Sequence, residues 1–486
     1  MRVAWLLRIG ASALVVILIL GFGPATAVGV TLLILAAIVV LLRPRLLIYA
    51  TFVLAFLTLP TAVPTTVSIG PFSFRAYEFT LALSAVYVLV SVKTTRAANV
   101  LAWLLGLLVM GGALLGVARQ NPMGDILTDV RWLAIMWLGF IVASRVVRTP
   151  AATILLRLLP WVLWVSAAFV LAGSLFGLPL TGRTEQASLS NIGDLNEATR
   201  LLTPTNFLAL AVVAGIIALA IAGRATFRGS LYLTAPAVLI LVLAFSRNSI
   251  LGIVAAAAFA LLVCWSIRAF IRVTLISVVV VAASVLLVAG APVIAQLPGG
   301  AWLNTQVESY TTRVVEGLNP STQATDPSAQ FREVSENQRI IPRIAESPVI
   351  GHGFGFAYKA ATGSPGTFER ELAYLYAHNF YLWLAVKTGL LGVAIFLLFI
   401  AWPGARSFRE RSSLNIALTA GVVALGTISI VAPMGNGSPT SALLGALIGG
   451  VVGMAVTNPD HGSFELVRRR TRRSAHSPQS PQPQSQ

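Results

Sequence analysis

The sequence predicts an all-α polytopic membrane protein with about 12 to 14 transmembrane helices and one large, partly helical extracytoplasmic loop. Of the 486 residues, 57% are hydrophobic and only 10% are charged. A soluble protein carries roughly 25% charged residues, so this composition excludes a cytosolic enzyme and a disordered protein. The single cysteine, Cys264, excludes a disulfide within the chain and a cysteine metal cluster.

Apolar runs of about 20 residues, the length that crosses a bilayer, recur from one end of the chain to the other. The runs cover residues 3–22, 25–42, 46–64, 77–92, 98–118, 132–147, 151–176, 205–222, 230–245, 248–267, 273–296, 376–402, 414–433 and 440–456. The first run follows Arg2 and Arg8 and precedes Ala25-Thr26-Ala27, as in a cleavable signal peptide. We expect an uncleaved helix, because a second apolar run follows directly.

The placement of Lys and Arg predicts the orientation of the chain. Connections on one side of the membrane hold 20 of the 34 cations and three of the 17 acids, whereas the alternate connections hold 12 cations and 14 acids. The basic side is cytoplasmic by the positive-inside rule, which places both termini in the cytoplasm. The net charge of +17 is then a topology signal with attraction to anionic lipids, and no nucleic-acid partner is expected. Arg157 and Lys387 fall within spans, near their ends, and are expected to snorkel.

Four regions follow from this division. They are transmembrane helices 1–11 in residues 1–296, a large extracytoplasmic loop in residues 297–375, transmembrane helices 12–14 in residues 376–456, and a disordered basic cytoplasmic tail in residues 457–486. Loops of this length without regular structure are usually either functional or disordered. This loop contains aromatic and apolar residues, so we expect it to fold onto the outer face.

Arginines on the extracytoplasmic side are the first candidates for chemistry, because membrane proteins normally place few cations there. A guanidinium pairs phosphate oxygens through two parallel hydrogen bonds, which suits the diphosphate of a lipid-linked donor. Arg247 lies in Phe245-Ser246-Arg247, a short turn between two apolar runs. The alternative for Arg247 is a side chain that snorkels to the outer headgroups.

Residues 328–347 are predicted to form a polar helix in the large loop. Arg332, Arg339 and Arg343 share one face of it at 100° per residue, although Pro342 is expected to kink or restart the helix. The three arginines are candidates for substrate binding. The alternative is a solvated helix face, with the arginines paired to Glu333, Glu336 and Glu346.

Two further features of the loop are candidates for function. Gly351, Gly353 and Gly355 alternate along the chain, which lets the backbone approach a ligand or another helix closely. His378 lies at the outer mouth of a span, where an imidazole can accept a proton from a hydroxyl near neutral pH. The alternative for His378 is an interfacial residue without a catalytic role, and His352 is a weaker candidate.

The remaining polar residues give weaker signals. Outer-side acids are candidates for holding sugar hydroxyls, and they are Asp125, Asp129, Asp194 and Glu197. The four histidines are scattered and form no set of metal ligands, and no nucleotide-binding fingerprint follows a predicted strand. We therefore expect neither a metal nor a cofactor.

Taken together, these motifs resemble the O-antigen ligase and polymerase superfamily of bacterial membrane glycosyltransferases. The resemblance covers about residues 200–400 and depends on Phe245-Ser246-Arg247, Glu336-Asn337-Gln338-Arg339, Glu346-Ser347-Pro348-Val349-Ile350-Gly351-His352-Gly353, Ala377-His378-Asn379-Phe380-Tyr381 and Gly389-Leu390-Leu391-Gly392. Members often carry an aromatic residue after the loop arginine, where this chain has Ile341-Pro342-Arg343. Arg343 thus either replaces or supplements Arg339.

The resemblance implies a metal-independent, inverting transferase at the outer face of the bacterial plasma membrane. Its donor would be an undecaprenyl-diphosphate-linked glycan, and its acceptor a hydroxyl of a glycan or glycolipid. Arg247 and Arg339 would hold the diphosphate, and His378 would assist the acceptor hydroxyl. Arg343 and Asn379, together with Arg332, are further candidates for binding the diphosphate or the glycan. Ligase and polymerase activities both remain open.

A second function, transport of a small solute or anion such as bicarbonate, stays open because some superfamily relatives are linked to it. Transporters usually place ionisable groups near the bilayer midplane, often at broken helices. The predicted spans contain almost none, and polar residues gather on one face. This pattern favours chemistry on a lipid-anchored substrate.

Overall fold

The computed structural model describes most of the chain from Arg43 onward. The described residues are 43–69, 72–182, 200–297, 300–311, 314, 330–364, 370, 372–432 and 438–454. The first two predicted spans, the loop acids Asp194 and Glu197, and the predicted disordered tail 457–486 lie outside the described residues.

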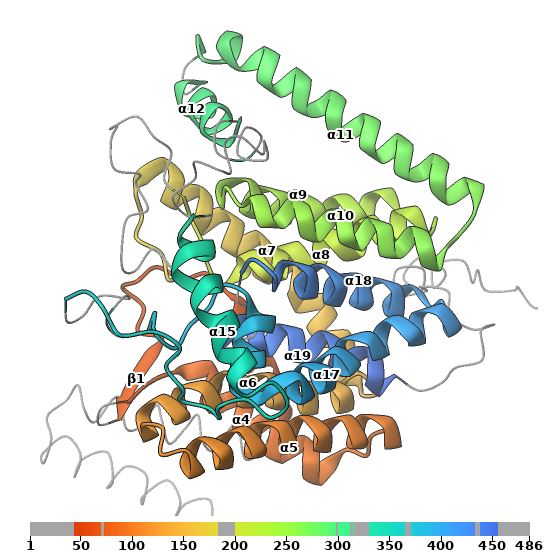
Figure 1. Ribbon diagram of the computed structural model, residues 1–486. Coiled ribbons are helices and arrows are strands. Elements are labelled where there is room, and N and C mark those ends of the chain that lie inside the picture. The colour runs from red at the N-terminus through yellow and green to blue at the C-terminus, as the bar shows by residue number, and fades with distance from the viewer. Residues whose placement is uncertain are drawn as a thin grey trace, which may run out of the picture.

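Twelve apolar helices build the described part of the fold, and each lies at a predicted span. They are α3 (Arg45–Phe56), α4 (Ala76–Ser91), α5 (Arg96–Ala118), α6 (Met123–Val146), α7 (Pro150–Phe176), α8 (Thr205–Ile221), α9 (Phe227–Leu243), α10 (Arg247–Val263), α11 (Ile267–Ile294), α17 (Phe380–Arg409), α18 (Ser413–Ile428) and α19 (Ser438–Gly453). Five of them, α5, α6, α7, α11 and α17, are long and apolar enough to cross a membrane. The all-α polytopic class is confirmed (Figure 1).

The prediction of a span over residues 46–64 is wrong in its second half. The helix ends at Phe56, and the chain then forms an antiparallel hairpin that the sequence analysis did not predict. Its strands are β1 (Thr66–Ile69) and β2 (Phe72–Arg75). Pro60 and Pro64 explain the early end, because proline inside a helix lacks a donor and clashes with the preceding turn.

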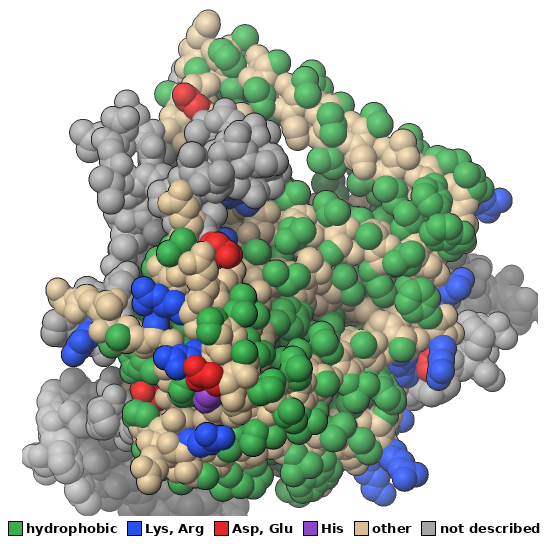
Figure 2. Space-filling model, viewed as in Figure 1, with side chains coloured by type: hydrophobic (Ala, Val, Ile, Leu, Met, Phe, Trp, Pro, Cys, Tyr) green, Lys and Arg blue, Asp and Glu red, His purple; other side chains and the backbone are tan. Residues whose placement is uncertain are grey.

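The connections predicted to be cytoplasmic meet at one end of the bundle, here called the basic end. The Arg224 guanidinium donates to the Arg411 carbonyl, and Arg406 Nη1 donates to Val452 O at 3.0 Å. Lys and Arg side chains line this edge at the right of Figure 2. The opposite end, called the loop end, carries the chain between α11 and α17. The compartment that each end faces stays a prediction.

Among the described residues between α11 and α17 there are three shorter helices: α12 (Gly300–Tyr310), the π-helix η4 (Phe331–Asn337) and α15 (Gln338–Glu346). The last two form the helix predicted over residues 328–347. Pro342 does not restart this helix, because α15 continues through it to Glu346. Pro342 lies close to the start of α15, so only the hydrogen bond to the Gln338 carbonyl is lost.

The helix α17 is broken about a third of the way along its 30 residues. Gly389 has φ 64° and ψ −172°, outside the helical range, so the backbone groups around it lose their helical partners. A re-entrant segment, residues 347–356, replaces these partners. Its N–H groups donate to Val386 O and Lys387 O at 3.0 and 2.8 Å, and one of its carbonyls accepts Leu390 N at 2.7 Å. Irregular backbone at membrane depth needs such internal partners.

Glycines allow the re-entrant segment to reach the helices. Gly351, Gly353 and Gly355 all have positive φ, a conformation that favours glycine. A Cβ at Gly353 would lie 2.3 Å from the backbone nitrogen of Gly116 in α5. Of the two uses predicted for these glycines, the structure shows the approach to other helices.

A buried ion pair secures the re-entrant segment. Lys387 Nζ donates to Asp129 Oδ2 at 2.6 Å and to Phe356 O at 2.8 Å, and Gly355 N donates to the same carboxylate oxygen at 2.7 Å. Both charged side chains are 0% exposed. The prediction that Lys387 snorkels is wrong, because a carboxylate and a carbonyl replace water inside the bundle. Asp129, a candidate for sugar binding, is its partner instead.

Gly353→Ala is expected to destabilise the fold strongly. The added methyl group would overpack against Gly116 at a φ of 82°, and each effect costs roughly 1–3 kcal/mol. We expect the midpoint of thermal unfolding in detergent to fall by several degrees. Gly111→Ala is the matched control, because no atom lies within 4 Å of its added Cβ. Equal midpoints for the two variants would contradict the close approach.

Lys387→Met is expected to cost about 3–5 kcal/mol of stability, because it leaves the Asp129 carboxylate buried without its counter-charge. The double variant with Asp129→Asn removes both charges and should recover a large part of this loss. Thermal unfolding of the purified single and double variants measures the difference. If the stability loss of the double variant equals the sum of the losses of the two single variants, the two groups are not coupled.

Candidate functional site

Glu336 holds His378 at the loop end by two hydrogen bonds. Its Oε2 accepts the backbone N–H of His378 at 2.8 Å, and its Oε1 accepts the Nδ1 hydrogen at 2.9 Å. The side chain of Glu336 is 2% exposed and that of His378 is 18% exposed. A carboxylate only accepts, so Nδ1 carries the hydrogen, and in the neutral imidazole the free lone pair is then on Nε2. This orientation leaves Nε2 available as a general base.

Aromatic residues surround this pair. Phe331 and Tyr376 contact the His378 ring edge-on, with centroids 6.3 and 5.2 Å away. Tyr358 is buried, and its hydroxyl donates to Tyr376 O at 2.6 Å. Burial, followed by the nearby Glu336 carboxylate, raises the pKa of Tyr358 above its usual value, so this hydroxyl stays a neutral donor.

The three arginines predicted in the loop helix have different surroundings. Arg339 is exposed, and its positive charge partly opposes the rise in the pKa of Tyr358. Arg343 pairs with Glu346 at 2.8 Å, and both are 49% exposed, as the solvated-face alternative predicted. Arg332 lies in the π-helical turn, where the count of 100° per residue does not apply. The predicted common face therefore does not extend to Arg332.

Arg247 is the first residue of α10. Phe245 before it has φ 44°, which is uncommon for a residue with a side chain, and its ring packs against Tyr310 of α12 with centroids 6.3 Å apart. Ser246, the N-cap residue, makes no side-chain cap hydrogen bond. The Arg247 charge thus adds to the positive end of the helix dipole, and both favour an anion.

The end of α18 lies between Arg247 and His378. A Cβ at Gly252, in the second turn of α10, would lie 3.1 Å from Ile428 Cγ2 at the end of α18. The next residue, Ser429, accepts the first backbone N–H of α17 at 2.9 Å. The turn of Arg247 and the residue before α17 therefore lie at the same end of the bundle, where Lys, Arg, Asp, Glu and His side chains gather over α15 (Figure 2).

Other predicted residues have structural partners. Asn379 is the N-cap of α17, and its Oδ1 accepts two backbone N–H groups of that helix at 3.0 and 3.2 Å. His352 Nε2 donates to Arg343 O at 2.8 Å, which ties the re-entrant segment to α15. Asp125 accepts the hydroxyl hydrogen of Tyr374 at 2.9 Å. These contacts position the chain around His378.

Sequence reasoning missed two residues of this site. Glu336 was considered only as a partner for the arginines, although its place in Glu336-Asn337-Gln338-Arg339 was a usable signal. Lys359 was not singled out. Its Nζ lies 5.0 Å from the ring centre of Phe331, and the ring of Phe331 in turn contacts that of His378.

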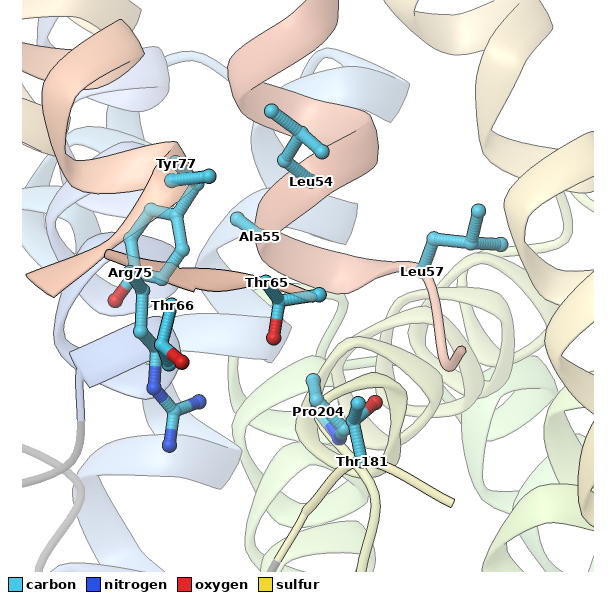
Figure 3. A pocket seen from close by; sticks show the side chains of 10 residues that line it. Leu54, Ala55, Leu57, Thr65, Thr66, Arg75, Tyr77, Thr181 and Pro204 are labelled. Atoms are coloured by element: carbon cyan, nitrogen blue, oxygen red, sulfur yellow. The ribbon is translucent and has the colours of Figure 1, made fainter. Parts of the chain in front are cut away.

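A separate pocket opens at the loop end between α3, the hairpin and α4 (Figure 3). It is lined by apolar helix residues and by a polar set that includes Thr66, Arg75 and Thr181. None of the residues predicted to form the site lines this pocket. The pocket and the Glu336–His378 pair are therefore separate places.

The chain matches the family model described as O-antigen ligase over residues 232–397. No curated protein matches the chain. The matched region holds Arg247, the Glu336–His378 pair and the re-entrant segment, so the motifs that carried the resemblance all lie inside it. The resemblance is thereby confirmed over this region: residues 232–397 match an O-antigen ligase domain, which supports the O-antigen ligase and polymerase superfamily.

Proposed function

We propose that the protein transfers a glycan from an undecaprenyl-diphosphate carrier to a hydroxyl of a glycan or glycolipid, as a ligase or a polymerase. The reaction takes place at the outer face of a bacterial plasma membrane. The observation that carries the proposal is the Glu336–His378 pair, because Glu336 lies on the same short helical stretch as Arg339. One helical stretch thus carries both the carboxylate that holds His378 and the Arg339 cation, inside the region that matches the O-antigen ligase model.

The proposed chemistry is a single displacement that inverts the anomeric carbon. His378 Nε2 accepts the proton of the acceptor hydroxyl while the hydroxyl oxygen bonds to the anomeric carbon. The bond from that carbon to the diphosphate oxygen breaks, and the electron pair leaves with the diphosphate. Arg339 and Arg247 stabilise the charge that develops there, and Glu336 stabilises the imidazolium. Two guanidinium groups supply this positive charge, so the reaction is metal-independent.

Transport is the second candidate, and two features favour it. The break in α17 and the Asp129–Lys387 pair are of the kind that transporters use. The prediction that the spans hold almost no ionisable groups is wrong at this pair. However, both charges are fully buried, and they bind each other and the re-entrant backbone. Because the pair has this structural use, transport of a solute such as bicarbonate is the weaker candidate.

His378→Gln is expected to lower the rate of glycan transfer by about 10²–10⁴-fold, because the acceptor hydroxyl loses its base. Glu336→Gln should lower it less, since the amide oxygen can still accept the backbone N–H of His378. The measurement follows consumption of the lipid-linked glycan by purified protein in liposomes. If the His378→Gln variant transfers glycan at the wild-type rate but no longer carries a bicarbonate flux, the transporter is supported instead.

Arg339→Ala is expected to lower transfer by about 10²–10³-fold, as when one preorganised charge-stabilising donor is removed. Arg343→Ala on the same helix is the matched control, because Arg343 pairs with Glu346 at 2.8 Å on the exposed face. It should change transfer only a few-fold. Arg339→Lys should restore part of the rate, since an ammonium carries the charge without the bidentate fork. Equal losses in the two alanine variants would remove the special role of Arg339.

A further inference from the structure

The connection between α5 and α6, residues 119–125 and here called the α5–α6 corner, includes a residue in the left-handed backbone region. Gln120 N donates to Val117 O and Asn121 N donates to Gly116 O, both at 3.0 Å, which closes α5 as a Schellman motif. The motif requires a positive φ at Gln120, where glycine is the usual residue. Gln120 has φ 59° and an exposed side chain. Such a backbone conformation persists only where the surrounding structure fixes it.

The α5–α6 corner presents Asn121 to the re-entrant segment. Asn121 Nδ2 donates to His352 O at 3.1 Å and to Phe354 O at 2.8 Å. A Cβ at Gly355 would lie 3.2 Å from Asn121 Cβ, so the segment passes directly against this side chain. Because the two carbonyls belong to alternate residues, the amide fixes the path of the segment rather than the place of a single atom.

The re-entrant segment passes this restraint on to the helix that carries Arg339. His352 Nε2 donates to Arg343 O at 2.8 Å, and the His352 ring stacks on Phe356 with centroids 4.1 Å apart. Arg343 lies one turn after Arg339 on α15. The position of the exposed Arg339 guanidinium therefore depends on a segment that Asn121 holds.

The same corner reaches the histidine through a second contact. Asp125, in the first turn of α6, accepts the hydroxyl hydrogen of Tyr374 at 2.9 Å. Tyr374 lies four residues before His378. Carbonyls between the two accept the side-chain hydrogens of Tyr358 and Trp383 at 2.6 and 2.9 Å. The two contacts of the corner thus begin four residues apart in the chain and lead to the cation and to the base of the proposed reaction.

We propose that the α5–α6 corner sets the spacing between Arg339 and His378, with Asn121 and Asp125 as positioning residues. The inference rests on the proposed function, in which the cation receives the diphosphate while the base receives the proton. A misplacement of about 1 Å between reacting groups can lower a rate roughly 10²-fold, so this spacing matters. The corner lies outside residues 232–397, so the first half of the chain helps to build the site.

A substitution that acts on the backbone alone tests the corner first. Gln120→Val places a β-branched side chain at a positive φ, and we expect kcat for glycan transfer to fall about tenfold through the displaced corner. The KM for the donor should stay within about twofold of the wild-type value. Ala118→Val is the matched control, because Ala118 is exposed and helical and lies two residues away. Equal kcat values for the two variants would contradict the proposal.

Double variants distinguish positioning from a general loss of structure. Asn121→Leu keeps the size of the side chain without the amide, and it should lower kcat about tenfold. In an Arg339→Ala background the same change should lower kcat by less than about twofold, because residues that act through one another are not additive. A tenfold loss in both backgrounds would overturn the proposal. Gln120→Val enters the same comparison, so the test does not depend on the folding of one variant.

The histidine side is tested in the same way. Asp125→Leu removes the acceptor of the Tyr374 hydroxyl and should lower kcat about tenfold, but by less than about twofold in a His378→Gln background. Asp125→Asn keeps an oxygen that accepts this hydrogen and should restore most of the rate. Equal losses in the leucine and asparagine variants would show that the hydrogen bond does not position His378.

Failure of the proposed function gives a different result. If His378→Gln and Arg339→Ala both transfer glycan at the wild-type rate, the proposed function fails and the positioning role fails with it. If these two variants are impaired while Asn121→Leu and Asp125→Leu transfer at the wild-type rate, the positioning role alone fails. The thermal unfolding midpoint of each variant in detergent shows that the compared proteins are folded.

Discussion

The hydrogen-bonded contact between the re-entrant segment and the break in α17 is the constraint on which the loop end depends. An unsatisfied backbone group costs several kcal/mol at membrane depth, so the break at Gly389 requires a second stretch of chain. That stretch also holds α15, because His352 donates to the Arg343 carbonyl. α15 continues η4, which carries Glu336, and Glu336 binds His378, two residues before α17 begins. The contacts form a closed ring.

Charged groups serve two different purposes in this ring. The Asp129–Lys387 pair is wholly buried, about 10 Å below the start of α17, and its donors and acceptors lie within the protein. Arg339 and the imidazole of His378 remain accessible at the loop end. The two groups of residues differ in how deeply they lie in the bundle. A charge inside the bundle, such as Asp129 or Lys387, is tolerated only when it is paired. A charge at the surface is available to a ligand.

Much of the fold could be predicted from the length of the apolar runs and from the placement of the charged residues. The bilayer sets a span near 20 residues, so the apolar runs marked every described transmembrane helix. The hairpin after α3 was missed, because its strands follow an apolar run that the prolines cut short. The alternating glycines indicated a close approach, but the sequence could not say to what. Gly353 meets α5, a helix more than two hundred residues earlier.

The site was predictable to a lesser degree, because its geometry depends on contacts between distant residues. Arg247 and His378 could be identified from the sequence because polar residues of these types are unusual at the ends of apolar spans. The partner of His378 could not, since Glu336 lies 42 positions earlier in a loop rich in acids. Asp129 and Lys387 lie 258 positions apart, and each alone resembled a residue near a span end. Pairing of this kind is a property of the folded bundle.

The π-helical turn η4 sets the rotational register of the site. Its wider turn lets Glu336 point inward while Arg339, three residues later, points outward. Deletion of Asn337, the last residue of η4, would rotate everything before it by the turn of one residue relative to α15. The aromatic ring and the carboxylate would swing away from the imidazole together, although no side chain that touches the histidine had been replaced. The spacing of this stretch therefore matters as much as its chemistry.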